Sequence, residues 1–152
     1  HPGLKARALA HGVLVALAPR GYWADESEGV PLALDELADA PLIGLSSADP
    51  LFARLDSYLQ AVEPPPRISI AVQTYSLARA MVESGAGLAV IDPFTALGAS
   101  RASTLVRPLS PALPITLYAL TRADEAPAHT LEGLLQLFAE RASEQLQRLA
   151  GG

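Results

Sequence analysis

The sequence of 152 residues contains no cysteine, which excludes structural disulfides, thiolate zinc sites and cysteine nucleophiles. Positive charge is also scarce, because 11 Lys and Arg face 16 Asp and Glu, for a formal net charge of -5. A nucleic-acid-binding surface needs clustered cations that release phosphate counterions, so this chain alone is a poor candidate for binding DNA. No hydrophobic run approaches the roughly 18–20 residues of a membrane helix, and no signal peptide opens the chain.

Candidate catalytic and metal-binding groups are few. The three histidines are His1, His11 and His129, and none of them follows a buried strand. No G-x-S-x-G motif is present, so we expect no nucleophilic triad and no catalytic residue. The glycines of 85–87 follow a helix and open a strand, which is the reverse of a phosphate-binding loop. The carboxylates of 25–28 are typical of a solvated loop, so we expect neither a metal nor a cofactor.

The composition is that of one folded domain. Half of the residues are hydrophobic and 18% are charged, which argues against disorder. A chain of this length buries roughly two-thirds of its unfolded surface, so it folds without disulfides or a metal.

Short apolar runs predict buried strands, and alternating polarity predicts a half-exposed one. The buried strands are expected at 13–18, 41–45, 68–72 and 88–91, with a half-exposed strand at 4–9, an edge strand at 104–107 and a longer strand at 115–120. His11-Gly12 predicts a tight turn that joins the first two strands as a hairpin.

Helix signals follow several of these strands. Asp49-Pro50 predicts the start of a helix that ends before 64–66, the three prolines. Thr74 predicts the cap of a second helix, which Gly85 ends, and a short third helix begins at Asp92. An apolar stripe predicts a C-terminal helix over 131–149. The alternation of strands and helices indicates an α/β fold with parallel strands.

In an open α/β sheet, ligands bind at the carboxyl ends of the strands. That rule nominates a cleft lined by Pro19, Ser46, Ser47, Gln73, Thr74, Asp92, Phe94 and Thr95. Short hydroxyls, helix N-termini and one aromatic ring are suited to a small anion or an amino acid. Taken singly, Thr74 and Asp92 are equally well explained as ordinary helix caps.

Several segments together carry a family resemblance. The strand 13–19, the run Leu34 to Ile43 with its D-E-L-A-D-A-P-L-I pattern and the run Met81 to Val90 resemble the effector-binding domain of LysR-type transcriptional regulators. Residues 106–109 and the strand 115–120 are similar to its later part. The resemblance covers nearly the whole chain, and it rests on the order and spacing of degenerate motifs.

The resemblance implies a type 2 periplasmic-binding-protein-like fold, in which two α/β lobes flank a cleft. Residues 1–33 would form the remainder of lobe I and the first crossing, 34–114 lobe II, and 115–152 the return strand and C-terminal helix of lobe I. The second crossing would lie at 111–114. The chain begins His1-Pro2 where further strands and a DNA-reading domain are expected upstream, so we expect an N-terminally truncated domain with an incomplete lobe I.

The function that the resemblance implies is sensing of a small-molecule effector without catalysis, in a bacterial regulator that works in the cytoplasm. The partners would be the effector, a second copy in a dimer or tetramer, and DNA through a helix-turn-helix domain absent from this sequence. The run 91–96 resembles members that respond to amino-acid conjugates such as opines. Two alternatives stay open, namely a periplasmic-type solute-binding protein for amino acids or small organic anions, and an enzyme that would use Asp92 as its acid or base.

Overall fold

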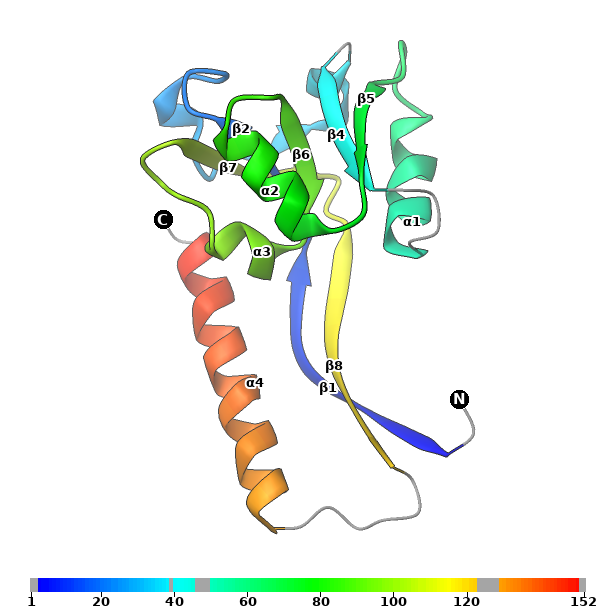
Figure 1. Ribbon diagram of the computed structural model, residues 1–152, viewed down its shortest axis with the longest axis vertical. Helices are drawn as coiled ribbons and strands as arrows, with labels where there is room; N and C mark the ends of the chain where they lie inside the picture. The colour runs from blue at the N-terminus through cyan, green and yellow to red at the C-terminus, as the bar shows by residue number, and fades with distance from the viewer. Residues whose placement is uncertain (1–2, 39, 46–49, 123–128, 151–152) are drawn as a thin grey trace.

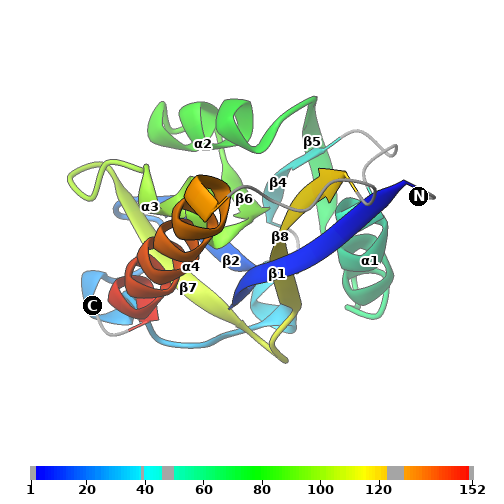
Figure 2. The ribbon, with the colours of Figure 1, turned by 90° about the horizontal axis from the view of Figure 1, so that it is seen from below.

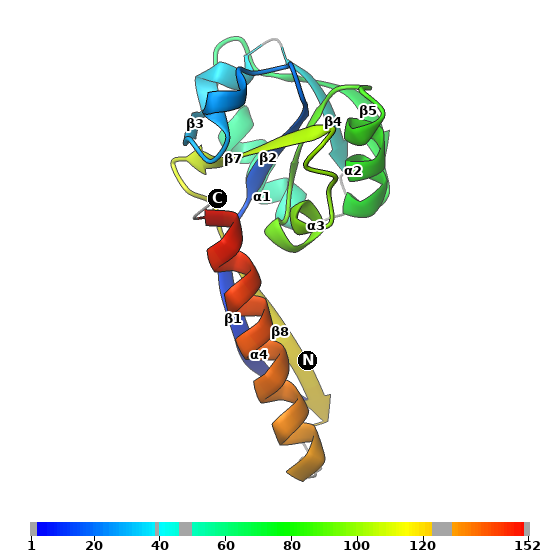
Figure 3. The same cartoon turned by 90° about the vertical axis from the view of Figure 1, so that its left-hand side faces the viewer.

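The protein, as a computed structural model, is described for residues 3–38, 40–45, 50–122 and 129–150. A six-stranded sheet carries helices on both faces, and a two-stranded ribbon and a long helix extend away from it (Figures 1 and 3). The strands are β1 (Leu4–Val13), β2 (Val15–Pro19), β3 (Leu32–Ala33), β4 (Pro41–Leu45), β5 (Arg67–Val72), β6 (Leu88–Ile91), β7 (Thr104–Ser110) and β8 (Pro114–Arg122). The α-helices are α1 (Pro50–Leu59), α2 (Tyr75–Glu83), α3 (Pro93–Leu97) and α4 (His129–Ala150), and two 3-10 turns are η1 (Asp25–Ser27) and η2 (Leu34–Leu37).

The large sheet is mixed, with the strand order β3-β7-β2-β6-β4-β5. β4 lies parallel to both of its neighbours, β5 and β6. β2 runs antiparallel to both of its own neighbours, β6 and β7. The α/β class expected from the alternation of strands and helices is confirmed. The expected parallel pairing holds for β4 with β5 and β6 and for β3 with β7, but not for β2.

The sheet is covered on both faces, as the continuous apolar run of β2 predicts. Ala16 and Ala18 face one cluster of buried residues, to which α1 contributes Leu55 and Leu59. Val15 and Leu17 face the other cluster, which includes Ala78 and Val82 of α2. Figure 2 shows α1 and α2 on the two sides of the sheet. Full burial of a valine or leucine such as Val15 or Leu17 stabilises the fold by roughly 1.5–3 kcal/mol. Like β4 and β6, β2 contributes to both clusters.

The hairpin predicted at His11-Gly12 is wrong. β1 continues through this dipeptide to Val13 and pairs with β8 in a separate two-stranded sheet. Gly12 is needed for a close approach instead of a turn, because a Cβ there would lie 3.1 Å from Cγ of Pro93 and 3.3 Å from Cδ2 of Leu146. A glycine inside a strand is often a sign of such an approach.

The border between the two sheets differs from the boundary expected at residue 34. β2 and β3 both lie in the six-stranded sheet, so the chain enters that sheet between Val13 and Val15 and leaves it between Ser110 and Pro114. β7 is also not an edge strand, because the two residues of β3 pair with Leu109 and Ser110 and cover it. A strand of two residues is too short to leave a periodic signal in the sequence.

The segment between β2 and β4 is held to the sheet by one buried arginine. Arg107 of β7 is 5% exposed, and its guanidinium donates to the carbonyl oxygens of Val30 and Pro31 at 3.0 and 2.9 Å. It also forms an ion pair of 3.0 Å with Glu36 and lies 5.2 Å from the ring centroid of Trp23. Arg107 therefore holds the carbonyl groups of Val30 and Pro31 and the carboxylate of Glu36 against β7.

Helix α2 begins and ends as its sequence predicts. Gly85 has φ 84°, its N–H donates to Val82 and the Ala86 N–H donates to Met81, which is the paired bonding of a left-handed helix end. The apolar residues of this helix predict a buried face of Leu77, Ala78, Met81 and Val82. Ala78 and Val82 are buried as that pattern predicts, but Leu77 is 48% exposed. The stripe predicted from apolar residues is therefore one residue too wide.

Helix α4 packs along β1 and reaches α3 with its C-terminal half (Figure 3). Leu149 packs against the cluster around Val15 and Leu17, whereas Leu134 and Phe138 of the predicted apolar stripe are 46% and 56% exposed. Within the part of the chain that is described, no helix has both the length and the hydropathy needed to cross a bilayer.

Candidate ligand-binding site

The carboxyl ends of β5, β4 and β6 lie level at one edge of the large sheet. Leu45 of β4 pairs with Val72 of β5. Ile43 of β4 pairs with Ala89 of β6, so two residues further along Leu45 lies beside Ile91. Gln73 and Asp92 directly follow these strands. Figure 1 shows this edge facing the side of the sheet from which β1 and β8 extend. Parallel strands thus bring together the two segments 73–74 and 92–95, as the sequence predicts.

Three of the eight residues nominated from the sequence behave differently or are not described. Pro19 is at the opposite edge, because β2 is antiparallel and Pro19 pairs with Thr104 at the start of β7. Val15, at the other end of β2, pairs with Ile91 and lies at the edge in question. Ser46 and Ser47 follow β4 in the sequence and lie outside the described residues.

Thr74 begins α2 at this edge. Its backbone is extended, with φ -141° and ψ 150°, and its Oγ1 accepts a hydrogen bond of 3.1 Å from the N–H of Leu77. This is the helix cap that the sequence predicts. Because the oxygen accepts from Leu77, the hydroxyl hydrogen of Thr74 is left to donate outward. Both Gln73 and Thr74 are exposed, so they can reach a bound molecule.

Asp92 and Thr95 are bonded to each other at the start of α3. One oxygen of Asp92 accepts from the N–H of Thr95 at 2.9 Å, and the other accepts from Oγ1 of Thr95 at 2.6 Å. Both carboxylate oxygens thus serve the cap. The reading of Asp92 as a helix cap is confirmed, and the pair fixes the start of the short helix that carries Phe94.

Replacing Asp92 with alanine should destabilise the protein by about 1–2 kcal/mol, because it removes the cap of α3 and the partner of the Thr95 hydroxyl. Asp92→Asn should retain most of the stability, since an amide oxygen also accepts from the N–H of Thr95. Thermal unfolding of the two variants measures the difference. Equal losses in both variants would show that the charge of Asp92, and not its capping oxygen, is what matters.

Asp92 and Phe94 line a cleft of about 630 Å³ between α3, the ribbon and α4. Its apolar walls come from Phe94 and Leu97 of α3, Leu9 of β1, Leu117 of β8 and Phe138 of α4. Arg141 and Gln145 of α4 supply polar groups. The ion pair of Arg141 with Glu144 is exposed on both sides, at 68% and 51%, so it is weak and leaves the guanidinium available.

This cleft suits a small molecule that carries a carboxylate and an apolar part. A guanidinium binds a carboxylate through two parallel N–H donors, and the two phenylalanines offer apolar contact. Neither Gln73 nor Thr74 lines the cleft. Sequence reasoning missed Leu9, Leu117 and Arg141, because they come from segments far from 92–95 in the chain.

Residues 1–143 match the family model described as the LysR substrate binding domain. The chain belongs to the LysR substrate-binding domain family. The fold resemblance stated from the sequence is therefore confirmed, and so is the type 2 periplasmic-binding-protein-like class.

Known relatives of this family member are transcriptional regulators. The HTH-type transcriptional regulator DgcR from Pseudoalteromonas sp. is 30% identical over 134 residues, which cover 88% of this chain and 45% of DgcR. The chain therefore spans less than half the length of this relative.

Two solved structures show the same fold at low identity. HinK, a LysR family transcriptional regulator from Pseudomonas aeruginosa, has a TM-score of 0.71 and 16% identity over 95% of this chain and 50% of its own. The regulatory domain of CcmR from Synechocystis, solved in complex with 2-PG, has a TM-score of 0.69 and 12% identity over 91% of this chain and 67% of its own. The family match and the similarity to DgcR favour a regulator over a solute-binding transport protein, whereas these two structures show the fold alone.

Among the described residues of this LysR-family chain, no group of three or more His, Asp or Glu side chains is placed to hold a metal ion.

Proposed function

We propose that this chain is the effector-sensing part of a LysR-type transcriptional regulator. The observation that carries the proposal is the level ending of β5, β4 and β6, which places Gln73 and Thr74 at the same edge as Phe94. The family match over 1–143 supports a sensing role for this edge.

The effector would contact Gln73, Thr74 and Phe94 on this lobe. Ser46 and Ser47 follow the central strand β4 and belong to the proposed contacts by their place in the sequence. Asp92 and Thr95 bond to each other, so their role would be to position Phe94 at the edge.

The effector would be a small organic acid or an amino-acid-like molecule. The N-terminus of α2 presents backbone N–H groups and a positive dipole end, and the Thr74 hydroxyl adds a donor. Arg141 supplies a positive charge in the adjoining cleft, and Phe94 supplies an apolar surface. These groups favour a carboxylate next to an apolar or neutral part.

The response would be a shift between two arrangements of the lobes. Only two short connections, between Val13 and Val15 and between Ser110 and Pro114, join the large sheet to the ribbon. Rotation about them would change the angle between the lobes, and it would also shift the contacts that α4 makes with α3 and, through Leu149, with the large sheet. The effector must bind the two arrangements with different affinity, since equal affinity shifts nothing. In a dimer or tetramer this change of angle would move the DNA-binding domains.

The chain would catalyse no reaction. Asp92 is the acidic group at the strand ends that an enzyme would need, and both of its oxygens are engaged in capping α3. A regulator of this kind contacts chromosomal DNA through its helix-turn-helix domain, so we place the chain in the cytoplasm.

Substitutions at Thr74 test the site while keeping the helix cap. A panel of amino acids, opines and small dicarboxylic acids is screened by thermal shift, and a ligand at a hundredfold excess over its Kd should stabilise by about 2.7 kcal/mol. Thr74→Ser should keep this shift. Thr74→Asp should keep α2 capped and the unliganded stability intact, but abolish the shift through repulsion of an anionic ligand.

Thr74→Ala should lose both the shift and about 1 kcal/mol of stability, because the cap is gone. A ligand whose thermal shift is unchanged in Thr74→Asp and in Phe94→Ala would contradict the proposed site.

A further inference from the structure

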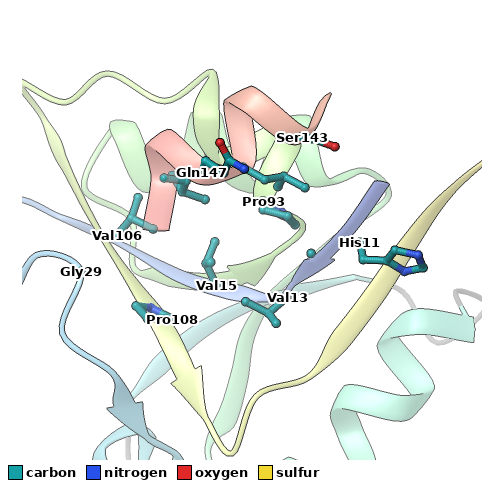
Figure 4. Close-up of a pocket in the computed structure, with 12 residues that line it drawn as sticks. His11, Val13, Val15, Gly29, Pro93, Val106, Pro108, Ser143 and Gln147 are labelled. Carbon is teal, nitrogen blue, oxygen red and sulfur yellow. The ribbon is translucent and has the colours of Figure 1, made fainter. Parts of the chain in front are cut away.

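A second cavity lies on the other side of α4, where Pro93 of the segment 92–95 forms part of its lining. It encloses about 650 Å³ between the last turns of α4, the end of β1 and the strands β2 and β7. Figure 4 shows its floor, formed by Val13, Val15, Val106 and Pro108, with Gln147 of α4 above it. Neither Thr74 nor Phe94 lines it. The two cavities share no lining residue, although Pro93 of this one lies between Asp92 and Phe94 in the chain.

The cavity stays open because α4 is held at two points along its last turns. Leu146 meets β1 at Gly12, where a Cβ would lie 3.3 Å from its Cδ2 atom. Leu149 packs against the apolar cluster of the large sheet. The floor between these points is made of valine and proline side chains, which are stiff and too short to fill the gap.

The lining selects against a charged occupant. Among the described residues that form this cavity there is no Lys, Arg, Asp or Glu, in contrast to the cleft that holds Asp92 and Arg141. A charged molecule would lose hydration here without gaining a partner, which is costly. His11, Ser143 and Gln147 are polar residues of the lining. In Figure 4 the ring of His11 points away from the floor, and its Nδ1 lies 3.1 Å from Oγ1 of Thr116 in β8.

We propose that this cavity binds a small, uncharged and largely apolar molecule at a site whose lining differs from that of the effector cleft. Its volume is within the range of pockets that enclose such ligands, and its chemistry pairs an apolar floor with a few hydrogen-bonding groups. Because the occupant would touch both α4 and the large sheet, it would also bias the position of α4 relative to that sheet.

The probe for the test is N-phenyl-1-naphthylamine, an uncharged dye whose fluorescence rises in apolar surroundings. The dye should bind the protein saturably with one site. Its sulfonated relative 8-anilino-1-naphthalenesulfonate, which has the same rings and a negative charge, should bind at least tenfold more weakly. Equal or tighter binding of the sulfonate would overturn the proposal.

Gln147→Trp places a large side chain over the cavity from an exposed position and should weaken dye binding at least tenfold. Glu140→Trp is the control, because it lies two turns earlier on α4, is exposed and lines neither cavity. Ser143→Trp is a second blocking variant in case the first does not fold. Unchanged affinity in both blocking variants would exclude this cavity as the site.

Two further measurements separate this proposal from the others. Thr74→Asp should leave the affinity for the dye unchanged, and Gln147→Trp should leave the effector-induced thermal shift unchanged. Each proposal can therefore be contradicted without the other. Sedimentation of Gln147→Trp should match that of the unmodified protein. Dissociation of an oligomer in this variant would show that a second copy covers the cavity and would overturn the proposal.

Discussion

Replacing Gly87 with alanine should destabilise the protein by about 2–5 kcal/mol. Gly87 has φ 153°, and a Cβ at this position would lie 2.6 Å from the carbonyl oxygen of Pro41. That oxygen belongs to the backbone of β4, so no side-chain rotation can relieve the contact. The next residue, Leu88, pairs with Leu42, and the added methyl group would force β4 and β6 apart at their first pair.

Gly85 provides the matched control two residues away. It also has a positive φ, 84°, but nothing lies within 4 Å of the Cβ that alanine would add. Gly85→Ala should therefore cost only the backbone strain, about 1–2 kcal/mol. Urea unfolding of the three proteins measures the free energies. Equal losses at the two positions would show that the contact with Pro41 relaxes freely.

The pairing of β4 with β6 next to Gly87 also sets the geometry of the proposed site. Pairing of Leu42 with Leu88 sets the alignment that brings Leu45 level with Ile91 at the other end of the same strands. Any separation of β4 from β6 would disturb the edge at which Asp92 begins α3. Gly87→Ala should weaken the effector-induced thermal shift as well as the fold.

Replacing Arg107 with alanine should destabilise the protein by about 2–4 kcal/mol. The change leaves the carbonyl oxygens of Val30 and Pro31 without their donor and removes the partner of Glu36. Glu36 has a side chain that is 45% exposed, so water can solvate it after the change. The loss comes mainly from the packing and hydrogen bonds of the Arg107 side chain, which is only 6% exposed.

Arg20→Ala is the control for Arg107. Arg20 also bonds two carboxylates and a carbonyl oxygen of the same region, those of Asp25, Glu28 and Arg101, but its side chain is 31% exposed. Water can replace the hydrogen bonds of Arg20 when its side chain is removed. Urea unfolding should therefore show a clearly smaller loss of unfolding free energy for Arg20→Ala than for Arg107→Ala. A loss as large as that of Arg107→Ala would contradict the role assigned to burial.

Acid should remove the contribution of the Glu36 ion pair. Hydrogen bonds from Arg107 hold the pKa of Glu36 below its ordinary value of 4.5, against the effect of partial burial, and the N–H of Ala33 adds to this. A lowered pKa in the folded state means that ionised Glu36 stabilises the fold fully above about pH 4.5 and loses this contribution as the pH falls through the lowered pKa.

Glu36→Gln should therefore be less stable than the unmodified protein at neutral pH, with a difference that shrinks in acid. Urea unfolding over a series of pH values measures this difference. The exposed Glu140→Gln should show no such trend. A difference between Glu36→Gln and the unmodified protein that stays constant down to acid pH would show that the charge of Glu36 does not stabilise the fold.

Local signals in the sequence predicted local structure well. The caps at Thr74 and Asp92, the left-handed end at Gly85 and the buried strand β6 depend on hydrogen bonds or burial within a few residues, so the sequence alone determines them. The position of segments 73–74 and 92–95 at one edge of the sheet followed from the same signals, because parallel strands place their carboxyl ends together.

Pairing between distant segments could not be read in the same way. Periodicity describes which face of a strand is buried, but the direction and partner of that strand depend on residues far along the chain. Pro19 was placed at the wrong edge because nothing local shows that β2 runs antiparallel to β6. A glycine can be needed for a turn or for the close approach of another side chain, and the sequence does not distinguish the two. Gly12 therefore suggested a turn, although it is needed for the approach of Leu146.

The sequence by itself determined the α/β class, the helix ends and the acidic, cysteine-free character of the chain, since each depends on composition or on neighbouring residues. The family, too, is recognisable from the order and spacing of its segments. Only the tertiary structure decided which strands share a sheet and that α4 separates two clefts. The reason is physical. Val106 of β7 and Gln147 of α4 line the same cavity although they are far apart in the sequence, so only the folded chain brings them together.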